Sequence, residues 1–551
     1  MWDILPIFAA DMENGKFMKR LRAIVVLIGW WTAAGMEAQN PYLPLWEHIP
    51  DGEPYVFEDP DRPGAYRVYV YGSHDNLVDA YCGRDQVVWS ASVDSLSHWR
   101  YDGIVFESKR NRQGSFLDKD GLGDVLYAPD VVEKVDGNGK KTYYLYPNNQ
   151  GRGRASMVAK ANRPDGPFEV CNWSTKNPDR TEGPLGFDPA VFIDDDGRVY
   201  GYWGFDTSWG AELDAETMAT LKAGCEPVKD LIPSRHQPGD FRFFEASSMR
   251  KIKDKYVFIY SRWTHDGEFG LPASNYTLAY AYGDAPLGPF RYGGTIIDGR
   301  ARGTDWVGNA VYTAHPDGNM HGSIVEIKGQ WYVFYHRQCG TDQYSRQAMV
   351  APIEVEVMEG PGGRVWISEG EYTSEGFATE GLDPTVRHSA GIACYYTGPE
   401  GAASHFPDYV FSGSYVQAAR PQYDGRSDTY DLTVNHNPVV NNTTGSIVGY
   451  KYFNLSNLKK SSKVVLQLQA VPTGIAGKIE IWIDSPWQEQ GGQRLGIIDI
   501  KGGQPRQMTT FKAKVPAAAK LQGKHALYLR FVSDTPEQSL CDLHYLQFAY
   551  K

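Results

Sequence analysis

A pattern that recurs five times along the chain constrains the fold more than any other feature of the sequence. Each copy reads as an apolar-alternating strand, a turn built from Asp, Gly or Lys, and an aromatic-rich strand, which together indicate a β-hairpin. The copies are Glu53–Asp75, Ala128–Asn149, Phe187–Phe205, Phe244–Trp263 and His321–Arg337. Successive copies begin about 57 to 77 residues apart, enough for a four-stranded blade with its loops. The sequence therefore predicts an all-β, five-bladed β-propeller; an open sandwich of similar hairpins is the alternative.

Each repeat also carries a short polar or charged residue at the head of its first strand. These residues are Glu53, Asp130, Asp188, Glu245 and His321. The innermost strands of a propeller converge on its axis, so we expect these side chains to share one central cavity. Carboxylates confined together cannot all ionise at their ordinary pKa values, so one is held protonated and can act as an acid at neutral pH.

The first 38 residues resemble a targeting segment. From Met18 the sequence MKRLRAIVVLIGWWTAAGMEAQ has a basic start, a short apolar run and small residues near Ala38, which is the layout of a cleaved signal peptide. An uncleaved membrane anchor is the alternative, although the apolar run is shorter than the roughly 20 residues that span a bilayer. We therefore interpret residues 1–38 as an upstream extension and signal peptide, and expect a periplasmic or secreted protein with no membrane association after cleavage.

A second domain is expected after the propeller. We assign residues 39–360 to the propeller, 361–389 to a linker and 390–551 to a β-sandwich of jelly-roll type. Phrases such as KIEIWIDSP (Lys478–Pro486) and HALYLRFVS (His525–Ser533) are strand-like and are separated by Gly-rich turns. The chain is thus predicted to be all-β throughout.

Composition narrows the range of partners. The net charge of −12 argues against nucleic acid, which needs a positive surface, and the 35 Tyr and 15 Trp residues suit a neutral polysaccharide or oligosaccharide. The six cysteines lack CxxC spacing, so we read them as mostly buried thiols rather than as a zinc site or a disulfide framework.

Glycoside hydrolysis with inversion fits the predicted cluster of carboxyl groups. It needs one protonated carboxyl to donate to the leaving oxygen and one carboxylate, about 6.5–9.5 Å away, to activate water. Glu245, between aromatic residues in RFFEASS, is the candidate acid, and Asp130 is the candidate carboxylate that orients it and tunes its pKa. Repeat register favours Glu53 as the base, while Asp51, two residues earlier in a Gly turn, is the alternative.

The remaining candidates would hold the substrate or an ion. Asp188 is expected to have a structural or substrate-orienting part. Arg346 is expected to reach the substrate cavity as a fixed charge beside the carboxylates, a surface ion pair being the alternative. His321 either binds a central cation through water or forms hydrogen bonds to the carboxylates, a core histidine being the alternative. Three tryptophans are candidate sugar platforms, namely Trp203, Trp263 and Trp306.

Taken in order, several motifs resemble glycoside hydrolase family 43 over about residues 40–358. The motifs are WSASVDSLSHW (Trp89–Trp99), YAPDVV (Tyr127–Val132), FDPAVFIDDDGRVY (Phe187–Tyr200), FFEASSMRKI (Phe243–Ile252) and HGSIVEIKGQWYVFYHR (His321–Arg337). The resemblance implies a five-bladed propeller, an inverting mechanism, Asp130 as pKa modulator, Glu245 as general acid, and an axial water or calcium ion near His321. One departure is that the family usually has Asp before Pro in the first blade, where this chain has Glu53 before Pro54.

The C-terminal region resembles a family 6 carbohydrate-binding module through VGYKYFNL (Val448–Leu455), IEIWIDSP (Ile479–Pro486) and HYLQF (His544–Phe548). Together the two resemblances imply an enzyme that removes α-L-arabinofuranose from plant-type polysaccharide and needs no cofactor for its chemistry, with a structural calcium ion near the axis. A β-xylosidase or exo-β-galactosidase of the same fold, and a catalytically silent propeller that only binds carbohydrate, are the alternatives.

Overall fold

The computed structural model describes residues 39–77, 80–149, 151, 153–315, 318–399, 413–418 and 437–551. The predicted signal peptide lies outside these residues. Within the described part of the chain, no helix has the length and apolar character needed to cross a membrane.

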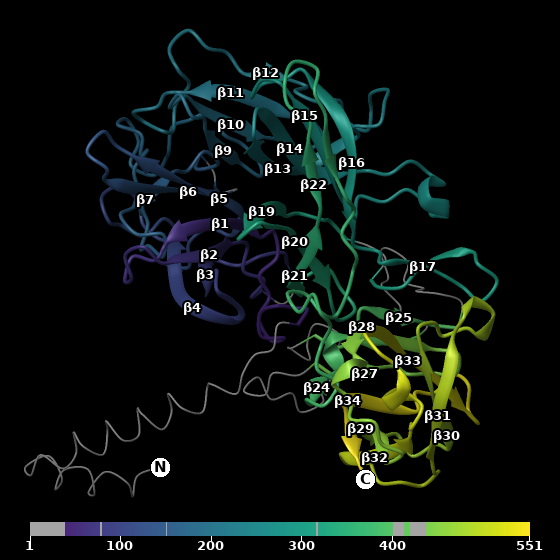
Figure 1. Cartoon of the computed structure of the whole chain (residues 1–551). Helices are drawn as coiled ribbons and strands as arrows, with labels where there is room; N and C mark the ends of the chain where they lie inside the picture. The colour runs from purple at the N-terminus through teal and green to yellow at the C-terminus, as the bar shows by residue number, and fades with distance from the viewer. Residues whose placement is uncertain are drawn as a thin grey trace, which may run out of the picture. The chain divides into compact units, whose positions relative to one another are not determined.

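Five antiparallel sheets follow one another along residues 53–353, and each begins at one of the five repeats (Figure 1). The first contains β1 (Glu53–Glu58), β2 (Tyr66–Tyr71), β3 (Asp85–Ser92) and β4 (Ser95–Glu107). The second contains β5 (Leu126–Val135), β6 (Lys141–Asn149), β7 (Ala159–Ala161) and β8 (Glu169–Val170). The third contains β9 (Ala190–Ile193), β10 (Val199–Trp203), β11 (Trp209–Leu213) and β12 (Val228–Lys229).

The fourth and fifth sheets complete the series. The fourth contains β13 (Phe243–Ile252), β14 (Lys255–Arg262), β15 (Thr277–Gly283) and β16 (Phe290–Asp298). The fifth contains β19 (Ser323–Ile327), β20 (Gln330–Gln338) and β21 (Arg346–Ile353), and the N-terminal segment lies against it through the amide of Asn40, which donates to Val350 O at 2.6 Å.

The innermost strands of the five sheets form a ring. β1 contacts β5 and β19, and β9 contacts β5 and β13. The ring closes between β13 and β19, where the hydroxyl oxygens of Ser248 and Ser323 lie 2.8 Å apart. Separate apolar clusters fill the spaces between successive sheets: one joins the first and second sheets, a second joins the second and third, and another joins the third and fourth. This arrangement is a five-bladed β-propeller, as the repeats predict.

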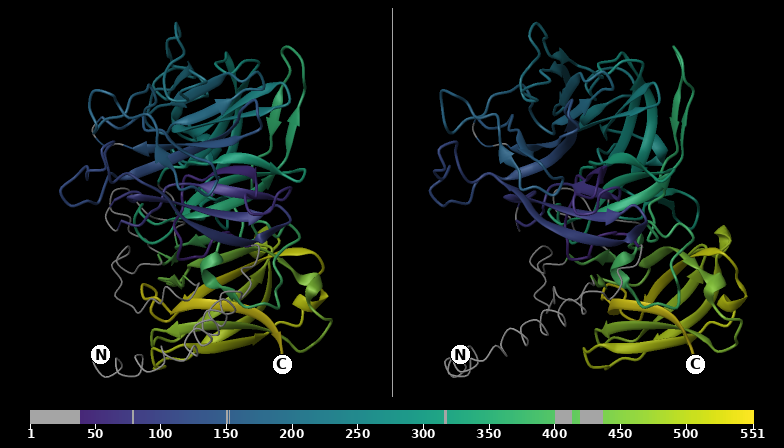
Figure 2. Two further views of the ribbon diagram at one scale, coloured as in Figure 1. Left: turned by 90° about the vertical axis from the view of Figure 1, so that its left-hand side faces the viewer. Right: turned by 60° about the vertical axis from the view of Figure 1, so that its left-hand side comes forward.

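Two antiparallel sheets form the C-terminal β-sandwich, and the views in Figure 2 show them as two layers. One sheet contains β24 (His388–Ser389), β26 (Tyr415–Val416), β27 (Val439–Val440), β29 (Val464–Pro472), β32 (Thr509–Lys514) and β34 (Cys541–Tyr550). The other contains β25 (Tyr395–Thr397), β28 (Ile447–Asn454), β30 (Gly477–Ile483), β31 (Gln493–Ile500) and β33 (Lys524–Ser533). Alternating residues such as Ile479, Ile481 and Ile483 face the core between the sheets, as the period of two requires. The prediction of a propeller followed by a β-sandwich is confirmed.

Two hairpins form two-stranded sheets of their own, separate from the five blade sheets. One consists of β17 (Arg302–Thr304) and β18 (Ala310–Tyr312), and the other of β22 (Val355–Val357) and β23 (Val365–Ile367). The stretch expected to be a linker, residues 361–389, therefore carries β23 and also β24, which pairs with β34 of the sandwich. All six cysteines are free thiols, and Cys82, Cys339, Cys394 and Cys541 are buried.

Candidate active site

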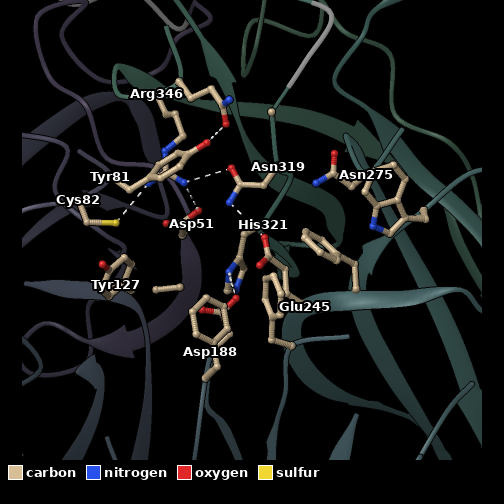
Figure 3. Close-up of a pocket in the computed structure, with 17 residues that line it drawn as sticks. Asp51, Tyr81, Cys82, Tyr127, Asp188, Glu245, Asn275, Asn319, His321 and Arg346 are labelled. Carbon is tan, nitrogen blue, oxygen red and sulfur yellow. Dashed lines mark hydrogen bonds and ion pairs between the residues drawn. The ribbon is translucent and has the colours of Figure 1, made fainter. Parts of the chain in front are cut away.

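A pocket of about 490 Å³ opens at the end of the propeller axis where the first strands begin (Figure 3). Its polar lining comes from several different blades, and the figure shows Asp51, Asp188, Glu245, His321 and Arg346 directed toward one another. The rest of the wall is formed by Tyr81, Cys82, Tyr127, Ala128, Phe187, Phe205, Phe244, Trp263, Asn275, Gly318, Asn319 and Gln343.

Asp51 lies two residues before β1. Its side chain is buried, and both carboxylate oxygens accept hydrogen bonds. Oδ1 accepts a hydrogen bond from Arg346 Nη1 at 2.9 Å, and Oδ2 accepts one from the hydroxyl of Ser73 at 2.6 Å. Burial on its own would raise the pKa of Asp51, but the charge of Arg346, together with that of His321, lowers it below the ordinary value. Asp51 is therefore an ionised carboxylate that faces the pocket.

Glu245 lies in β13 at a place where the ladder to β14 is irregular. The register shifts on both sides of this residue, a local bulge of the kind that re-aims a side chain out of the regular alternation. Oε1 of Glu245 accepts a hydrogen bond from Asn319 Nδ2 at 3.2 Å. Burial and then the nearby charge of Asp188 raise its pKa to about 8, so Glu245 carries a proton at neutral pH.

Asp188 links His321 to the backbone next to Glu245. Its Oδ2 accepts a hydrogen bond from the backbone N–H of Ala246 at 3.2 Å and lies 3.5 Å from Nδ1 of His321, while Oδ1 accepts one from Asn148 Nδ2 at 2.7 Å. Burial would lower the pKa of His321, but Asp188 outweighs it and raises that pKa to about 9. Asp188 thereby fixes the backbone that follows Glu245.

Backbone conformation also marks the site. Asp51 and Asp188 have φ values of 60° and 47°. Residues other than Gly are uncommon in this left-handed region, and they cluster at functional sites. Each residue lies two positions before the first strand of a blade, Asp51 before β1 and Asp188 before β9. The strained turns at these positions direct both carboxylates into the pocket.

Arg346, at the start of β21, is fully buried beside the pocket. Its Nε and Nη2 donate to the two oxygens of Asp75, each at 2.9 Å, and its guanidinium lies 4.9 Å from the ring centre of Tyr81. Tyr81 in turn donates a hydrogen bond to Gln343, which joins loops of the first and fifth blades. Asp75 and Asn319 contribute to the site although the sequence did not single them out, because both lie outside the regular strands.

Glu53 and Asp130, predicted as base and pKa modulator, do not line this pocket. Glu53 Oε2 accepts from Arg250 Nη2 at 2.7 Å, and Arg250 also donates to the hydroxyl of Tyr55, which donates to Asp130 Oδ1 at 2.7 Å. The positions predicted as catalytic thus form a second buried network further along the axis. The reason is the direction of β1, which starts near the pocket and runs away from it along the axis. Asp51, before the strand, therefore lines the pocket, whereas Glu53, the first residue of the strand, lies below the pocket.

The three tryptophans predicted as sugar platforms lie in three different environments. Trp263 lines the pocket. Trp203 is only 8% exposed and stacks on Trp209 within the core between the second and third blades. Trp306 is 60% exposed on the turn between β17 and β18 and does not line the pocket.

The surroundings of His321 bear on the expected metal ion. Among the residues that the structure describes, no group of three or more His, Cys, Asp or Glu side chains is arranged to hold a metal ion. Nδ1 of His321 already faces Asp188, so direct ligation through that nitrogen does not fit this arrangement. A calcium ion bound through water stays a prediction.

The chain is similar to known proteins over most of its length. The family model "Glycosyl hydrolases family 43" matches residues 59–357. A protein named xylosidase/arabinosidase from Thermoclostridium stercorarium is 32% identical over 510 residues, covering 89% of this chain and 95% of the relative. A β-xylosidase from Xylanibacter ruminicola is 33% identical over 321 residues, covering 49% of this chain and 89% of the relative. An arabinoxylan arabinofuranohydrolase from Bacillus subtilis (strain 168) is 23% identical over 521 residues, covering 91% and 89%. With a family model that spans most of the propeller and a relative that is similar over almost its whole length, this chain belongs to family 43 of the glycosyl hydrolases.

Proposed function

We propose that the protein removes α-L-arabinofuranosyl units from arabinoxylan-type polysaccharide with inversion at the anomeric carbon. One observation carries the proposal. Two carboxyl groups from the first and fourth blades face one pocket with their pKa values moved in opposite directions, that of Asp51 downward and that of Glu245 to about 8. Such a pair can supply a base and an acid at the same pH.

The proposed reaction uses these two groups and one water molecule. Glu245 donates its proton to the glycosidic oxygen as the bond from that oxygen to the anomeric carbon breaks. Water attacks the anomeric carbon from the opposite face, and Asp51 takes the proton that the water loses. Asp188 and His321 hold the segment that carries Glu245, and Asp188 helps to keep Glu245 protonated until the substrate is bound.

The names of relatives support a pentose as the released sugar. The relative that is similar over most of this chain is named for both xylosidase and arabinosidase activity, and another is named arabinoxylan arabinofuranohydrolase. We place arabinofuranose first and a β-xylosyl unit second. A catalytically silent propeller was suggested by Glu53 in place of Asp, and the presence of Asp51 in the pocket removes that reason.

Product analysis tests the proposal directly. Digestion of arabinoxylan should release arabinose as the only monosaccharide, and proton NMR at early times should show β-L-arabinofuranose before mutarotation. Xylose as the sole product would favour the second candidate. Initial release of the α-anomer would contradict the inverting mechanism and the role of Asp51 as base.

We also propose that the C-terminal β-sandwich is a carbohydrate-binding module of the family 6 type. Its two antiparallel sheets support the proposal. Trp482 in β30 is only 7% exposed and packs beneath Arg530, so the sugar contact would come from another part of the sandwich. Affinity electrophoresis of the full chain in arabinoxylan, with the pocket saturated by arabinose, should still show retardation; free migration would contradict the proposal.

A further inference from the structure

One wall of the pocket is a continuous row of aromatic rings contributed by the second, third and fourth blades. Successive ring centres lie 6.4, 5.3, 4.9 and 5.8 Å apart. The rings are, in order, Tyr127, Phe187, Phe205, Phe244 and Trp263. Beyond the last ring, the guanidinium of Arg235 lies 4.5 Å from the ring centre of Trp263 and closes the row.

Phe205 differs from its neighbours in being open to solvent. Its side chain is 51% exposed, whereas Phe244, packed against it, is 8% exposed. A half-exposed phenylalanine that is supported by two other rings and that lines a pocket presents a flat apolar face which the fold itself does not cover. Such a face can receive the apolar face of a sugar ring.

The chemistry of the pocket decides which part of the substrate meets this face. A general acid must lie beside the leaving oxygen, so the leaving group lies on the side of Glu245. Phe244 directly precedes Glu245 in β13, and Phe205 packs on Phe244. The opposite side, around Asp51, is bordered by the polar groups of Arg346, Tyr81 and Gln343, which suit the attacking water rather than a ring face.

We propose that Phe205 is the platform for the leaving group, on which a pyranose ring of the polysaccharide main chain stacks while the released sugar occupies the pocket. This inference rests on the proposed function, because it uses Glu245 as the acid. The row from Phe205 to Trp263 then offers stacking surface to the next ring of the same main chain. The ligand class is a neutral chain of pyranose residues that bears the cleaved unit as a branch.

The test compares Phe205→Ala with a matched variant on two substrates. Tyr66→Ala is the control, because Tyr66 is 49% exposed but pairs with Glu58 at the end of β1 remote from Asp51. The substrates are an arabinosylated xylo-oligosaccharide and methyl α-L-arabinofuranoside, whose methyl group is too small to stack. For Phe205→Ala we expect kcat/KM on the oligosaccharide to fall roughly tenfold, mainly through KM, with little change on the methyl glycoside.

Two further variants and the wild type separate the inference from the proposed function. Phe205→Trp should restore most of the kcat/KM on the oligosaccharide, and Tyr66→Ala should match the wild type on both substrates. An unchanged oligosaccharide kcat/KM in Phe205→Ala, or an equal loss on both substrates, would overturn the inference while leaving the proposed function intact. A wild-type protein that cleaves neither substrate would instead contradict the proposed function.

Discussion

Arg346 donates from Nη1 to Oδ1 of Asp51 at 2.9 Å while its other edge is fully occupied by Asp75. One guanidinium therefore serves two buried carboxylates, and only one of them faces the pocket. The planar fork of Arg allows this division, because each edge can meet a separate acceptor. The arrangement keeps Asp51 ionised inside a largely aromatic pocket where burial alone would favour its protonated form.

Replacing Arg346 with Lys tests this relationship. A lysine ammonium is a point charge that cannot serve both carboxylates with the same geometry. We expect the pKa of Asp51 to rise, so that the acid limb of the kcat/KM profile moves to higher pH, and kcat/KM at the optimum to fall about 100-fold. Arg300→Lys is the control, since Arg300 is equally buried and pairs bidentately with Asp298 outside the pocket. An acid limb that stays in place in Arg346→Lys would contradict the argument.

Asp51→Asn should abolish turnover. The amide keeps the size of the side chain but cannot accept a proton from water, so we expect kcat on arabinosylated xylo-oligosaccharides to fall at least about 1,000-fold. Binding of arabinose, measured by calorimetry, should persist because the pocket walls are unchanged. A variant with kcat within tenfold of the wild type would remove Asp51 from the reaction.

Glu53→Gln separates the two candidate bases. Glu53 pairs with Arg250 in the buried network below the pocket, so its loss should lower the free energy of unfolding by roughly 3–5 kcal/mol. We expect kcat to stay within about tenfold of the wild type, because Glu53 does not face the pocket. Urea unfolding and steady-state kinetics on the same preparation measure both quantities. A loss of kcat as large as that of Asp51→Asn, without loss of stability, would return the base to Glu53.

The sequence predicted the blades well because the residues that specify a β-hairpin lie close together in the sequence. Alternating apolar residues, turn residues and aromatic strands fall within about 20 residues of each other, and each of the five repeats became the inner hairpin of a sheet. The placement of Glu245 on the axis follows from the same register. Repeat register also brought Asp188 and His321 to the pocket.

The two-residue offset between Glu53 and Asp51 could not be read from that register. It depends on how far along the axis each strand begins, which is set by the left-handed turn at Asp51 and by tertiary contacts with Arg346 and Ser73. For a similar reason, the sequence could not show which of the tryptophans lines the pocket. Trp203 ends a strand and turns into the core between blades, whereas Trp263 follows a strand and lines the pocket, and aromatic composition is the same in both.

Glu245→Gln should remove activity and yet stabilise the protein at alkaline pH. The variant cannot donate a proton, so kcat should fall at least about 1,000-fold on natural glycosides and much less on substrates with strongly activated aryl leaving groups, which need no proton. In the wild type, activity should decline as pH rises through about 8, where Glu245 loses its proton. Activity that rises through pH 8 would contradict this role.

The stability effect has a definite sign. The folded pKa of about 8 exceeds the ordinary value of 4.5, so between these values the folded protein binds a proton that the unfolded chain does not, and wild-type stability falls as pH rises through this window. Gln carries no charge at any pH. The Tm of Glu245→Gln minus that of the wild type should therefore grow from pH 5 to pH 8.5 in differential scanning calorimetry, while Glu537→Gln, a substitution at an exposed position, should show no such trend. A difference in Tm that stays constant with pH would mean that Glu245 ionises without cost in the folded pocket, and the assignment of a protonated acid at neutral pH would fail with it.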